Sequence, residues 1–192
     1  MTQKEKIIKR GFDVFFSLLG LALLGWFILL LVLLSKIVIK GNGIFKQKRV
    51  GQFGEFFFIY KIETIWPNIV KGKEEDFTLF GLFLRDLKFD ELPQLWNVLI
   101  GTMSFVGPRP DIPGYADKLK GKERIILSVN PGITGPATLY FRKEEELLKS
   151  QENPKKYNRE IIWPQKVAMN IKYVEEYSFL KDMYYIYKTL FL

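Results

Sequence analysis

The sequence contains no cysteine and no histidine among its 192 residues. The lack of cysteine excludes thiol nucleophiles and disulfides, and the lack of both excludes Cys/His zinc sites and Ser-His-Asp machinery. An enzyme of this composition therefore takes its nucleophile or base from Asp, Glu, Lys, Tyr, Ser or Thr. A chain without disulfides also fits a catalytic part on the cytosolic side of a membrane.

Acidic residues are scarce at the start of the chain. Nine of the 29 Lys/Arg residues but only two of the 21 Asp/Glu residues lie in residues 1–50, which therefore carry +7 of the net charge of +8. Basic residues gathered in this way suit anionic lipid headgroups, at about 1 kcal/mol for each residue near the surface. No recognised nucleic-acid-binding motif accompanies them. We therefore expect membrane lipids, and no nucleic acid, as partners.

Charge is absent from Val14–Ser35, an apolar run of 22 residues. As a helix rising about 1.5 Å per residue it would reach roughly 33 Å, enough to cross a hydrocarbon core of about 30 Å. The run is too long for a signal peptide, and no small-residue cleavage site follows it. Basic residues flank both ends, so the positive-inside rule leaves two topologies open. One is a spanning helix, and the other is a re-entrant hairpin bent near Gly20 or Gly25 with both ends cytoplasmic.

The middle of the chain predicts short elements. Apolar and polar residues alternate around Gly51 and Gly54, which predicts a β-hairpin over residues 44–65. A polar loop is expected at 66–76 and a short amphipathic helix at 77–88.

The second half of the chain predicts loops followed by helices. Residues 107–115 and 131–136 are expected to be Gly/Pro-rich loops, and 141–160 a charged surface helix and loop. The Tyr-rich segment 166–192 is expected to be helical. It would lie either at the membrane–water interface or against the domain core.

An adjacent acid pair, Asp90-Glu91, opens an apolar helical pattern that ends at Gly101. On one interpretation Asp90 caps this helix and Glu91 complements its dipole. On the other, the helix N-terminus attracts phosphate and a carboxylate acts as a nucleophile. Because successive side chains point in different directions, the pair suits two roles, one attacking and one holding a metal. The residues expected to form the apolar face of the helix are Leu92, Leu95, Trp96 and Leu99.

Cations and glycines that suit phosphate lie on both sides of the acid pair. In Gly107-Pro108-Arg109-Pro110 two prolines restrict the backbone around a guanidinium whose planar fork matches phosphate oxygens. The segment Pro131–Pro136 is either a plain turn or a loop whose glycines bring backbone N–H groups to a ligand. Lys61 and Arg85 are further cations, which taken singly would be surface charges.

Together these residues resemble the bacterial sugar transferase family, the monotopic phosphoglycosyl transferases that start glycan assembly on polyprenyl phosphate. Residues 80–110 carry most of the resemblance, with D-E-L-P-Q-L-W-N-V-L followed by M-S-F-V-G-P-R-P. Further matching segments are residues 9–17 (KRGFDVFFS), 45–51 (FKQKRVG) and 131–135 (PGITG).

The resemblance implies an α+β fold, mostly helical with a small β-hairpin, in a monotopic membrane protein. Residues 1–40 would form a membrane-embedded helix, for which the family favours the re-entrant form. Residues 41–192 would form a cytosolic catalytic domain with interfacial helices. The protein would lie in the bacterial inner (cytoplasmic) membrane, with its catalytic domain facing the cytoplasm.

The resemblance also implies the chemistry. Asp90 would attack the β-phosphate of a UDP-sugar and release UMP, and undecaprenyl or another polyprenyl phosphate would then accept the sugar-1-phosphate. This is the first membrane step of bacterial surface glycan assembly, such as exopolysaccharide, O-antigen or glycoprotein. Glu91 would hold Mg²⁺. Phosphate would be bound by Arg109, Arg85 and Lys61, and the loop with Gly132, Thr134 and Gly135 would lie near the nucleotide.

The sequence departs from the family pattern at two places, and two alternatives to the covalent route stay open. Gly25-Trp26 stands where the family has a Ser-Pro break, and Glu63 stands where it has a cation. One alternative is direct attack by the lipid phosphate, with Asp90 or Glu91 as base. Another is a non-catalytic membrane scaffold for glycan-assembly enzymes, for which Glu63 is the only support in the sequence.

Overall fold

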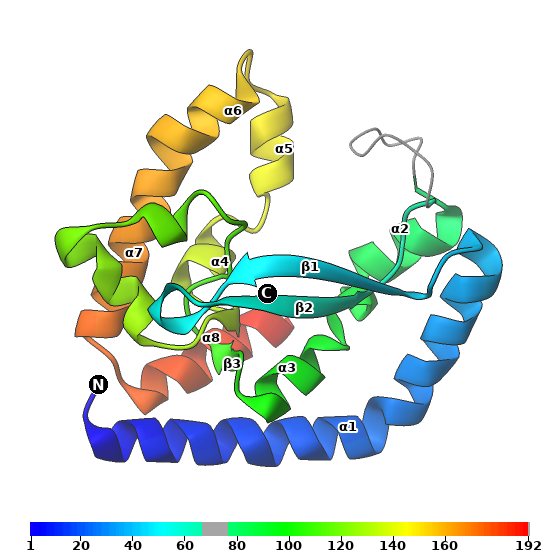
Figure 1. The fold of residues 1–192 in the computed structure, drawn as a ribbon, viewed down its shortest axis with the longest axis horizontal. Coiled ribbons are helices and arrows are strands. Elements are labelled where there is room, and N and C mark those ends of the chain that lie inside the picture. Colours follow the sequence, from blue (N-terminus) through cyan, green and yellow to red (C-terminus); the bar gives the residue numbers. More distant parts are fainter. Residues whose placement is uncertain (67–76, 192) are drawn as a thin grey trace. The chain divides into compact units, whose positions relative to one another are not determined.

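The computed structural model describes residues 1–66 and 77–191, so residues 67–76 of the predicted polar loop lie outside it. The chain forms two compact units. Unit 1 comprises Met1–Phe12, Arg49–Phe57 and Gly101–Leu192, and unit 2 comprises Asp13–Lys48 and Phe58–Ile100. Helices predominate, with two two-stranded sheets (Figure 1). The predicted α+β class, mostly helical, is therefore confirmed.

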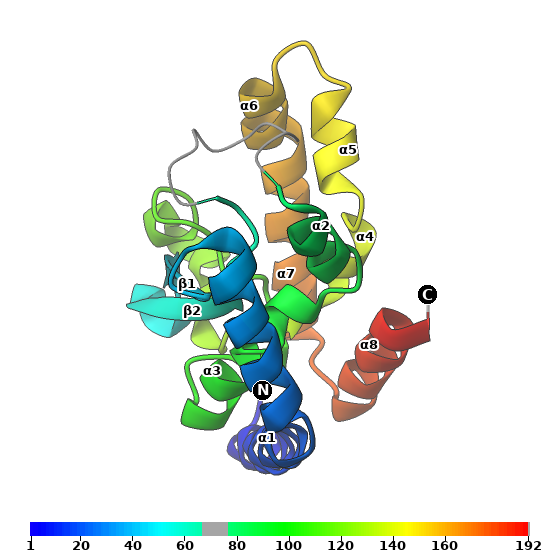
Figure 2. The same ribbon diagram turned by 90° about the vertical axis from the view of Figure 1, so that its right-hand side faces the viewer.

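Helix α1 (Gln3–Ile39) contains the whole predicted apolar run. It is continuous, and it bends in its second half, as Figures 1 and 2 both show. Its most apolar 18-residue window has a mean hydropathy of 2.7, and only 17% of that window is buried. Within the described residues it is the one helix long and apolar enough to cross a membrane. Its low burial distinguishes it from the core helix of a soluble protein.

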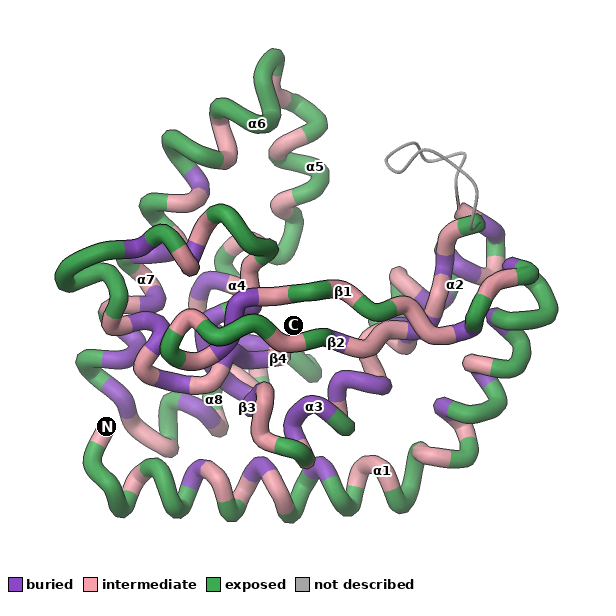
Figure 3. The backbone as a smooth tube through the Cα atoms, viewed as in Figure 1, coloured by how far each residue is buried: buried purple, intermediate pink, exposed green. Residues whose placement is uncertain are grey.

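In the first half of α1 the buried side is polar. Lys9, Asp13 and Ser17 are all buried, and their four-residue spacing puts them on one face. Large apolar side chains, among them Phe15 and Leu23, are exposed instead, and Figure 3 shows most of the helix as exposed or half-buried. A helix in water buries its apolar side. The reversed polarity of α1 fits a lipid environment and supports membrane association.

Strands β1 (Ile44–Val50) and β2 (Phe56–Ile62) pair as the predicted hairpin. The tight turn η1 (Gln52–Gly54) joins them, with positive φ at Phe53 and Gly54.

Unit 2 is organised around a small apolar cluster. Leu31 of α1, Ile62 of β2 and Leu84 of α2 (Leu79–Asp86) are buried together. The hydroxyl of Thr78 caps α2 by accepting from the Gly81 N–H at 2.8 Å. The predicted helix at 77–88 is thus confirmed, with slightly narrower bounds.

The structure around the acid pair differs from the interpretation of Asp90 as a helix cap. Asp90 is not a helix N-cap: it lies inside the 3-10 turn η3 (Phe89–Glu91), and α3 (Gln94–Ile100) begins four residues after it. The turn is entered through Lys88, whose φ of 59° is left-handed. The predicted end is confirmed, since Gly101 follows Ile100 with a φ of 86°.

The predicted apolar face of α3 is not the side that is most buried. Trp96 is exposed, and the residues buried on this helix are Gln94, Asn97 and Val98. The apolar side is directed partly at the membrane helix: a methyl group added at Gly20 of α1 would lie 3.2 Å from Leu95 Cδ1. The polar side is buried because Asn97 hydrogen-bonds β2. The apolar stripe of α3 therefore does not coincide with its most buried side, because part of the stripe lies against α1 and part of it is exposed.

Unit 1 holds a short parallel sheet. Strand β3 (Ser104–Val106) pairs with β4 (Gly132–Thr134), with Ser104 opposite Gly132 and Val106 opposite Thr134. The expected Gly/Pro loop at 131–136 is therefore partly a strand. Two 3-10 helices, η4 (Ala116–Lys118) and η5 (Gly121–Ser128), lie between the strands in sequence.

The helices of unit 1 follow the sheet. They are α4 (Pro136–Tyr140), α5 (Glu144–Lys149), α6 (Pro154–Tyr157), α7 (Trp163–Glu175) and α8 (Phe179–Phe191). Helices α5 and α6 lie side by side, which agrees with the predicted charged surface segment (Figures 1 and 2). Helix α6 runs into α7 through the π-turn η6 (Asn158–Ile162). That irregularity just precedes Pro164, which has no N–H to donate.

For residues 166–192 the sequence left two environments open, the domain core and the membrane–water interface. In the structure one part of this segment is buried and another exposes apolar side chains. Tyr173 and Tyr177, at the end of α7 and just beyond it, are buried with Val106 and Val129. Helix α8 exposes large apolar side chains instead, namely Leu180, Tyr184, Tyr187, Leu190 and Phe191.

Candidate active site

Unit 2 brings Lys61 and the acid pair together. Lys61 Nζ lies 2.6 Å from Glu91 Oε1 and 3.9 Å from Asp90 Oδ2. All three side chains are largely buried. The two neighbouring carboxylates are thus unequal, because Glu91 is paired with a cation and Asp90 is not in direct hydrogen-bond contact with one.

Asp90 is a buried carboxyl with an unsatisfied oxygen. Among the described residues its Oδ1 has no hydrogen-bond partner. Burial raises the pKa of Asp90 above its ordinary value, and the positive charge of Lys61 opposes that rise. Glu91 adds to the rise, whereas Arg85 and Lys88 lower it. A buried carboxyl oxygen without a hydrogen-bond partner is costly and is usually explained by function.

Asn97 fixes α3 to β2 and was missed in the sequence. Its Nδ2 donates to the Phe58 carbonyl at 2.7 Å, and its Oδ1 accepts from the Tyr60 N–H at 3.2 Å. Because Lys61 follows Tyr60, the same strand that Asn97 binds also presents the cation to Glu91. An asparagine beside apolar residues in a helical pattern was the available signal.

Arg85 is the second predicted cation near the acid pair. Its guanidinium lies 4.7 Å from the centroid of the Phe77 ring, and its charge contributes to lowering the pKa of Asp90. Stacking of this kind holds a guanidinium in one orientation.

The acid pair fits a magnesium ion shared with substrate. Within the described residues there is no group of three or more acidic side chains that could hold a metal alone. Mg²⁺ commonly takes one or two carboxylates and completes its shell with water and substrate phosphates. The Glu91 carboxylate is one such ligand group, and it lies next to the Asp90 carboxyl.

Arg109 lies in a braced loop of unit 1. It is itself exposed. Arg49 Nη1 donates to the Pro110 carbonyl at 2.9 Å, and the Val50 N–H donates to the Asp111 carbonyl at 2.9 Å. The end of β1 therefore holds the backbone on the far side of Arg109.

The two Gly/Pro motifs form one backbone junction. The Gly107 N–H donates to the Thr134 carbonyl, and the Gly132 N–H donates to the Pro108 carbonyl. A Cβ at Gly132 would lie 2.1 Å from the Gly107 nitrogen, and one at Gly135 would lie 2.3 Å from the Gly107 oxygen. Glycine is required because the two backbones approach so closely.

The predicted nucleotide loop is occupied by internal contacts. Thr189 donates its hydroxyl proton to the Tyr185 carbonyl, so Thr134 donates to Thr189 at 2.6 Å. With the Gly132 N–H bonded to Pro108, this loop positions the Arg109 segment. A contact of Gly132, Thr134 or Gly135 with a nucleotide stays a prediction.

Asp111 is an acidic residue beside Arg109 that the sequence analysis passed over. It lines a small pocket with Arg109, Pro108 and Gly51. Burial raises the pKa of Asp111 to about 6, against the opposing charges of Lys166, Arg49 and Arg109. An acid following directly after G-P-R-P was the signal that could have identified it.

Glu63, which replaces a cation of the family pattern, has a local structural role. Its Oε2 accepts from the backbone N–H groups of Asn42 and Gly43, at 2.8 and 3.1 Å. Its carbonyl accepts from the Ser35 hydroxyl at 2.6 Å. Glu63 therefore fastens the turn between α1 and β1 and is not an isolated anion.

Comparison with known proteins now identifies the family. The family model described as Bacterial sugar transferase matches residues 4–192. The chain belongs to the bacterial sugar transferase family. Family membership confirms the resemblance inferred from the motifs and the expectation of a transferase.

Relatives of this chain are themselves named as transferases. A Bacillus subtilis (strain 168) protein, putative undecaprenyl-phosphate N-acetylgalactosaminyl 1-phosphate transferase, is 35% identical over 63% of this chain and 72% of its own length. Uncharacterized sugar transferase EpsL of the same strain is 33% identical over 92% of this chain and 82% of its own. The UDP-glucose:undecaprenyl-phosphate glucose-1-phosphate transferase of Klebsiella pneumoniae is 30% identical over 96% of this chain but only 40% of its own.

Proposed function

We propose that this sugar transferase moves a sugar-1-phosphate from a UDP-sugar to undecaprenyl phosphate, releasing UMP. The names of the relatives support undecaprenyl phosphate as acceptor and a nucleotide sugar as donor. The observation that carries the catalytic assignment is the buried Asp90, whose Oδ1 has no partner among the described residues and which lies beside the Lys61–Glu91 pair.

Asp90 is the nucleophile of the proposed reaction. Its carboxylate oxygen attacks the β-phosphorus of the donor, and the bond from that phosphorus to the bridging oxygen breaks, so UMP leaves with that oxygen. An oxygen of undecaprenyl phosphate then attacks the phosphorus of the aspartyl-phosphosugar. The acyl-phosphate bond breaks, the Asp90 carboxylate is restored, and the sugar becomes linked to the lipid through a diphosphate.

The remaining side chains have supporting roles. Arg109, Arg85 and Lys61 bind phosphate oxygens, and Lys61 also holds Glu91 in place. Glu91 would hold Mg²⁺, which offsets the charge of the diphosphate when bound. The loop with Gly132, Thr134 and Gly135 would lie near the nucleotide.

The proposed substrates explain why the chain has a membrane helix, because undecaprenyl phosphate stays in the bilayer whereas the nucleotide sugar is soluble. We place the protein in the bacterial inner membrane with both ends of α1 cytoplasmic, as a re-entrant helix. The bend in α1, the basic residues on both flanks of its apolar run and its buried polar face support this arrangement. The reaction would begin the assembly of an exopolysaccharide or another surface glycan.

The deciding experiment measures two products with purified protein. UDP-glucose and UDP-N-acetylgalactosamine are incubated with Mg²⁺ and undecaprenyl phosphate, and UMP and glycosylated lipid are quantified. Asp90→Asn should lose about 10³-fold or more of the turnover, because it removes the nucleophile. Asp86→Asn, which changes an exposed aspartate of α2, should keep wild-type activity. Without lipid acceptor, the wild type should release no more than one UMP per enzyme.

Intact-protein mass spectrometry separates the alternatives. A mass increase equal to one sugar phosphate, absent in Asp90→Asn, supports the covalent route. Turnover without any such adduct would favour direct attack by the lipid phosphate. Full turnover by Asp90→Asn would disprove the assignment. The scaffold alternative has lost its only support, because Glu63 is used locally to fasten a turn.

A further inference from the structure

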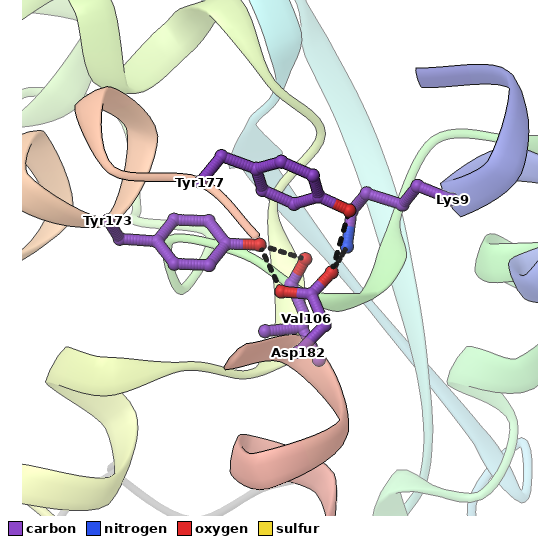
Figure 4. Close-up of polar contacts among 5 residues, drawn as sticks. All are labelled: Lys9, Val106, Tyr173, Tyr177 and Asp182. Atoms are coloured by element: carbon purple, nitrogen blue, oxygen red, sulfur yellow. Dashed lines mark hydrogen bonds and ion pairs between the residues drawn. The ribbon is translucent and has the colours of Figure 1, made fainter. Parts of the chain in front are cut away.

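A buried polar cluster lies in unit 1, apart from the residues assigned so far. Lys9 Nζ of α1 lies 2.5 Å from Asp182 Oδ2 of α8. The Tyr173 hydroxyl donates to Asp182 Oδ1 at 2.8 Å, and the Tyr177 hydroxyl lies 3.4 Å from Asp182 Oδ2 (Figure 4). All four residues are buried, and Asp182 is only 1% exposed. The carboxylate of Asp182 is therefore the centre of the cluster.

The cluster reaches the strand that leads to Arg109. The Tyr173 hydroxyl shares this one proton with the carbonyl oxygen of Val106, the last residue of β3, as a second acceptor at 3.3 Å, and Figure 4 shows this oxygen beside the Asp182 carboxylate. Gly107-Pro108-Arg109 follows directly. One network thus connects the start of α1, the end of α7 and α8 to the end of β3, which the loop carrying Arg109 follows.

Simple membrane anchoring does not explain this arrangement. Lys9 is one of the basic residues of the N-terminal segment expected to face lipid headgroups, but it is buried in an ion pair instead. Burying a lysine and an aspartate together is no efficient source of stability, because both charges lose their hydration. Buried pairs of this kind are best attested where they select one arrangement among several.

We propose that Lys9, Asp182 and Tyr173 form a positioning network for Arg109. The network fixes the end of β3 relative to the first turns of α1, and so sets the position of the Arg109 segment within unit 1. The three are positioning residues, since none is assigned a substrate contact. The role of Arg109 as phosphate ligand rests on the proposed function, whereas the tie to β3 does not.

The first test is independent of activity. Hydrogen exchange is followed by mass spectrometry in full-length protein in detergent, over peptides covering residues 104–109. Tyr173→Phe keeps the ring and removes only the hydroxyl, and we expect the Ser104 and Gly107 amides to exchange about tenfold faster. Tyr177→Phe is the matched control and should change exchange less than about twofold. Unchanged exchange in Tyr173→Phe would overturn the proposal.

The second test is a double-mutant cycle on kcat/KM for the UDP-sugar. Tyr173→Phe should lower kcat/KM about tenfold in the wild type but less than about twofold in Arg109→Ala, because the two residues act through one contact. Equal losses in both backgrounds would mean that the hydroxyl is merely structural and would overturn the positioning role. An inactive wild type would count against the proposed function alone, since the exchange result still decides the tie to β3.

Discussion

At the residue scale, the two adjacent carboxylates differ because of what surrounds them. Glu91 is bonded to Lys61, whereas burial raises the pKa of Asp90 and no described group satisfies its Oδ1. A nucleophilic carboxylate must be ionised, so its protonated form is inactive at low pH. Because the pKa of Asp90 is raised, the acid limb of the kcat/KM profile should lie above the ordinary range of an aspartate.

Lys61→Met tests this electrostatic relation. The charge of Lys61 is the largest influence that lowers the pKa of Asp90. Its removal should raise that pKa further, so the acid limb of the kcat/KM profile should move to higher pH. Relative to the wild type, Lys61→Met should therefore lose more activity at low pH than at high pH.

Two variants make the Lys61 test specific. Lys61→Arg keeps the charge and should restore most of the profile. Lys88→Met removes a weaker and exposed charge, and it should shift the acid limb less. An acid limb that stays in place in Lys61→Met would show that Asp90 is not the group titrating in the profile.

At the element scale, β3 and β4 depend on a backbone approach that only glycine permits. The Gly107 N–H donates to Thr134 and the Gly132 N–H donates to Pro108 across the junction, and a Cβ at Gly132 would fall 2.1 Å from a backbone nitrogen. Backbone atoms cannot turn aside as the end of a flexible side chain can. The two strands would have to separate, and the loop carrying Arg109 would move with them.

Gly132→Ala should accordingly destabilise the protein by about 1–3 kcal/mol, as overpacking of a close contact does. Thermal unfolding in detergent, followed by circular dichroism, would measure the loss. Gly11→Ala is the matched control, since a Cβ there has no neighbour within 4 Å and α1 favours alanine over glycine. The control should unfold at the wild-type temperature or above it. A Gly132→Ala protein as stable as this control would refute the close approach.

At the scale of the whole molecule, α1 is shared by both units and has reversed polarity. Its first residues belong to unit 1 and the rest to unit 2. Four of its polar residues, Lys9, Asp13, Ser17 and Ser35, are buried, and much of its apolar surface is exposed. A bend in a helix of this kind is consistent with entry and exit on one side of the membrane.

Single-cysteine labelling should establish the topology of α1, because the native chain contains no cysteine. We expect Gln3→Cys and Asn42→Cys to react with a membrane-impermeant maleimide from the cytoplasmic side only, as a re-entrant helix requires. Right-side-out and inverted vesicles supply the two sides. Trp26→Cys, within the apolar run, should stay unlabelled in both. Labelling of the two flanking positions from opposite sides would establish a spanning helix instead.

Much of the fold could be predicted because its signals are local. The uncharged run Val14–Ser35 predicted α1, alternation predicted the hairpin, and Gly101 marked the end of α3. The interior side of α3 could not be predicted, because an apolar stripe that is partly exposed and one that faces the core look the same in a sequence. Asn97 is buried only because β2 offers it a carbonyl and an N–H.

The sequence by itself determined the family, the membrane helix and the kinds of side chain available for chemistry, since these depend on residue type and short spacing. The tertiary structure decided which charges meet: Lys61 pairs with Glu91 across 30 positions, and Lys9 pairs with Asp182 across 173. It also decided the burial that raises the pKa of Asp90. Such contacts depend on how distant elements pack, and the residues between them carry no local signal of the pairing.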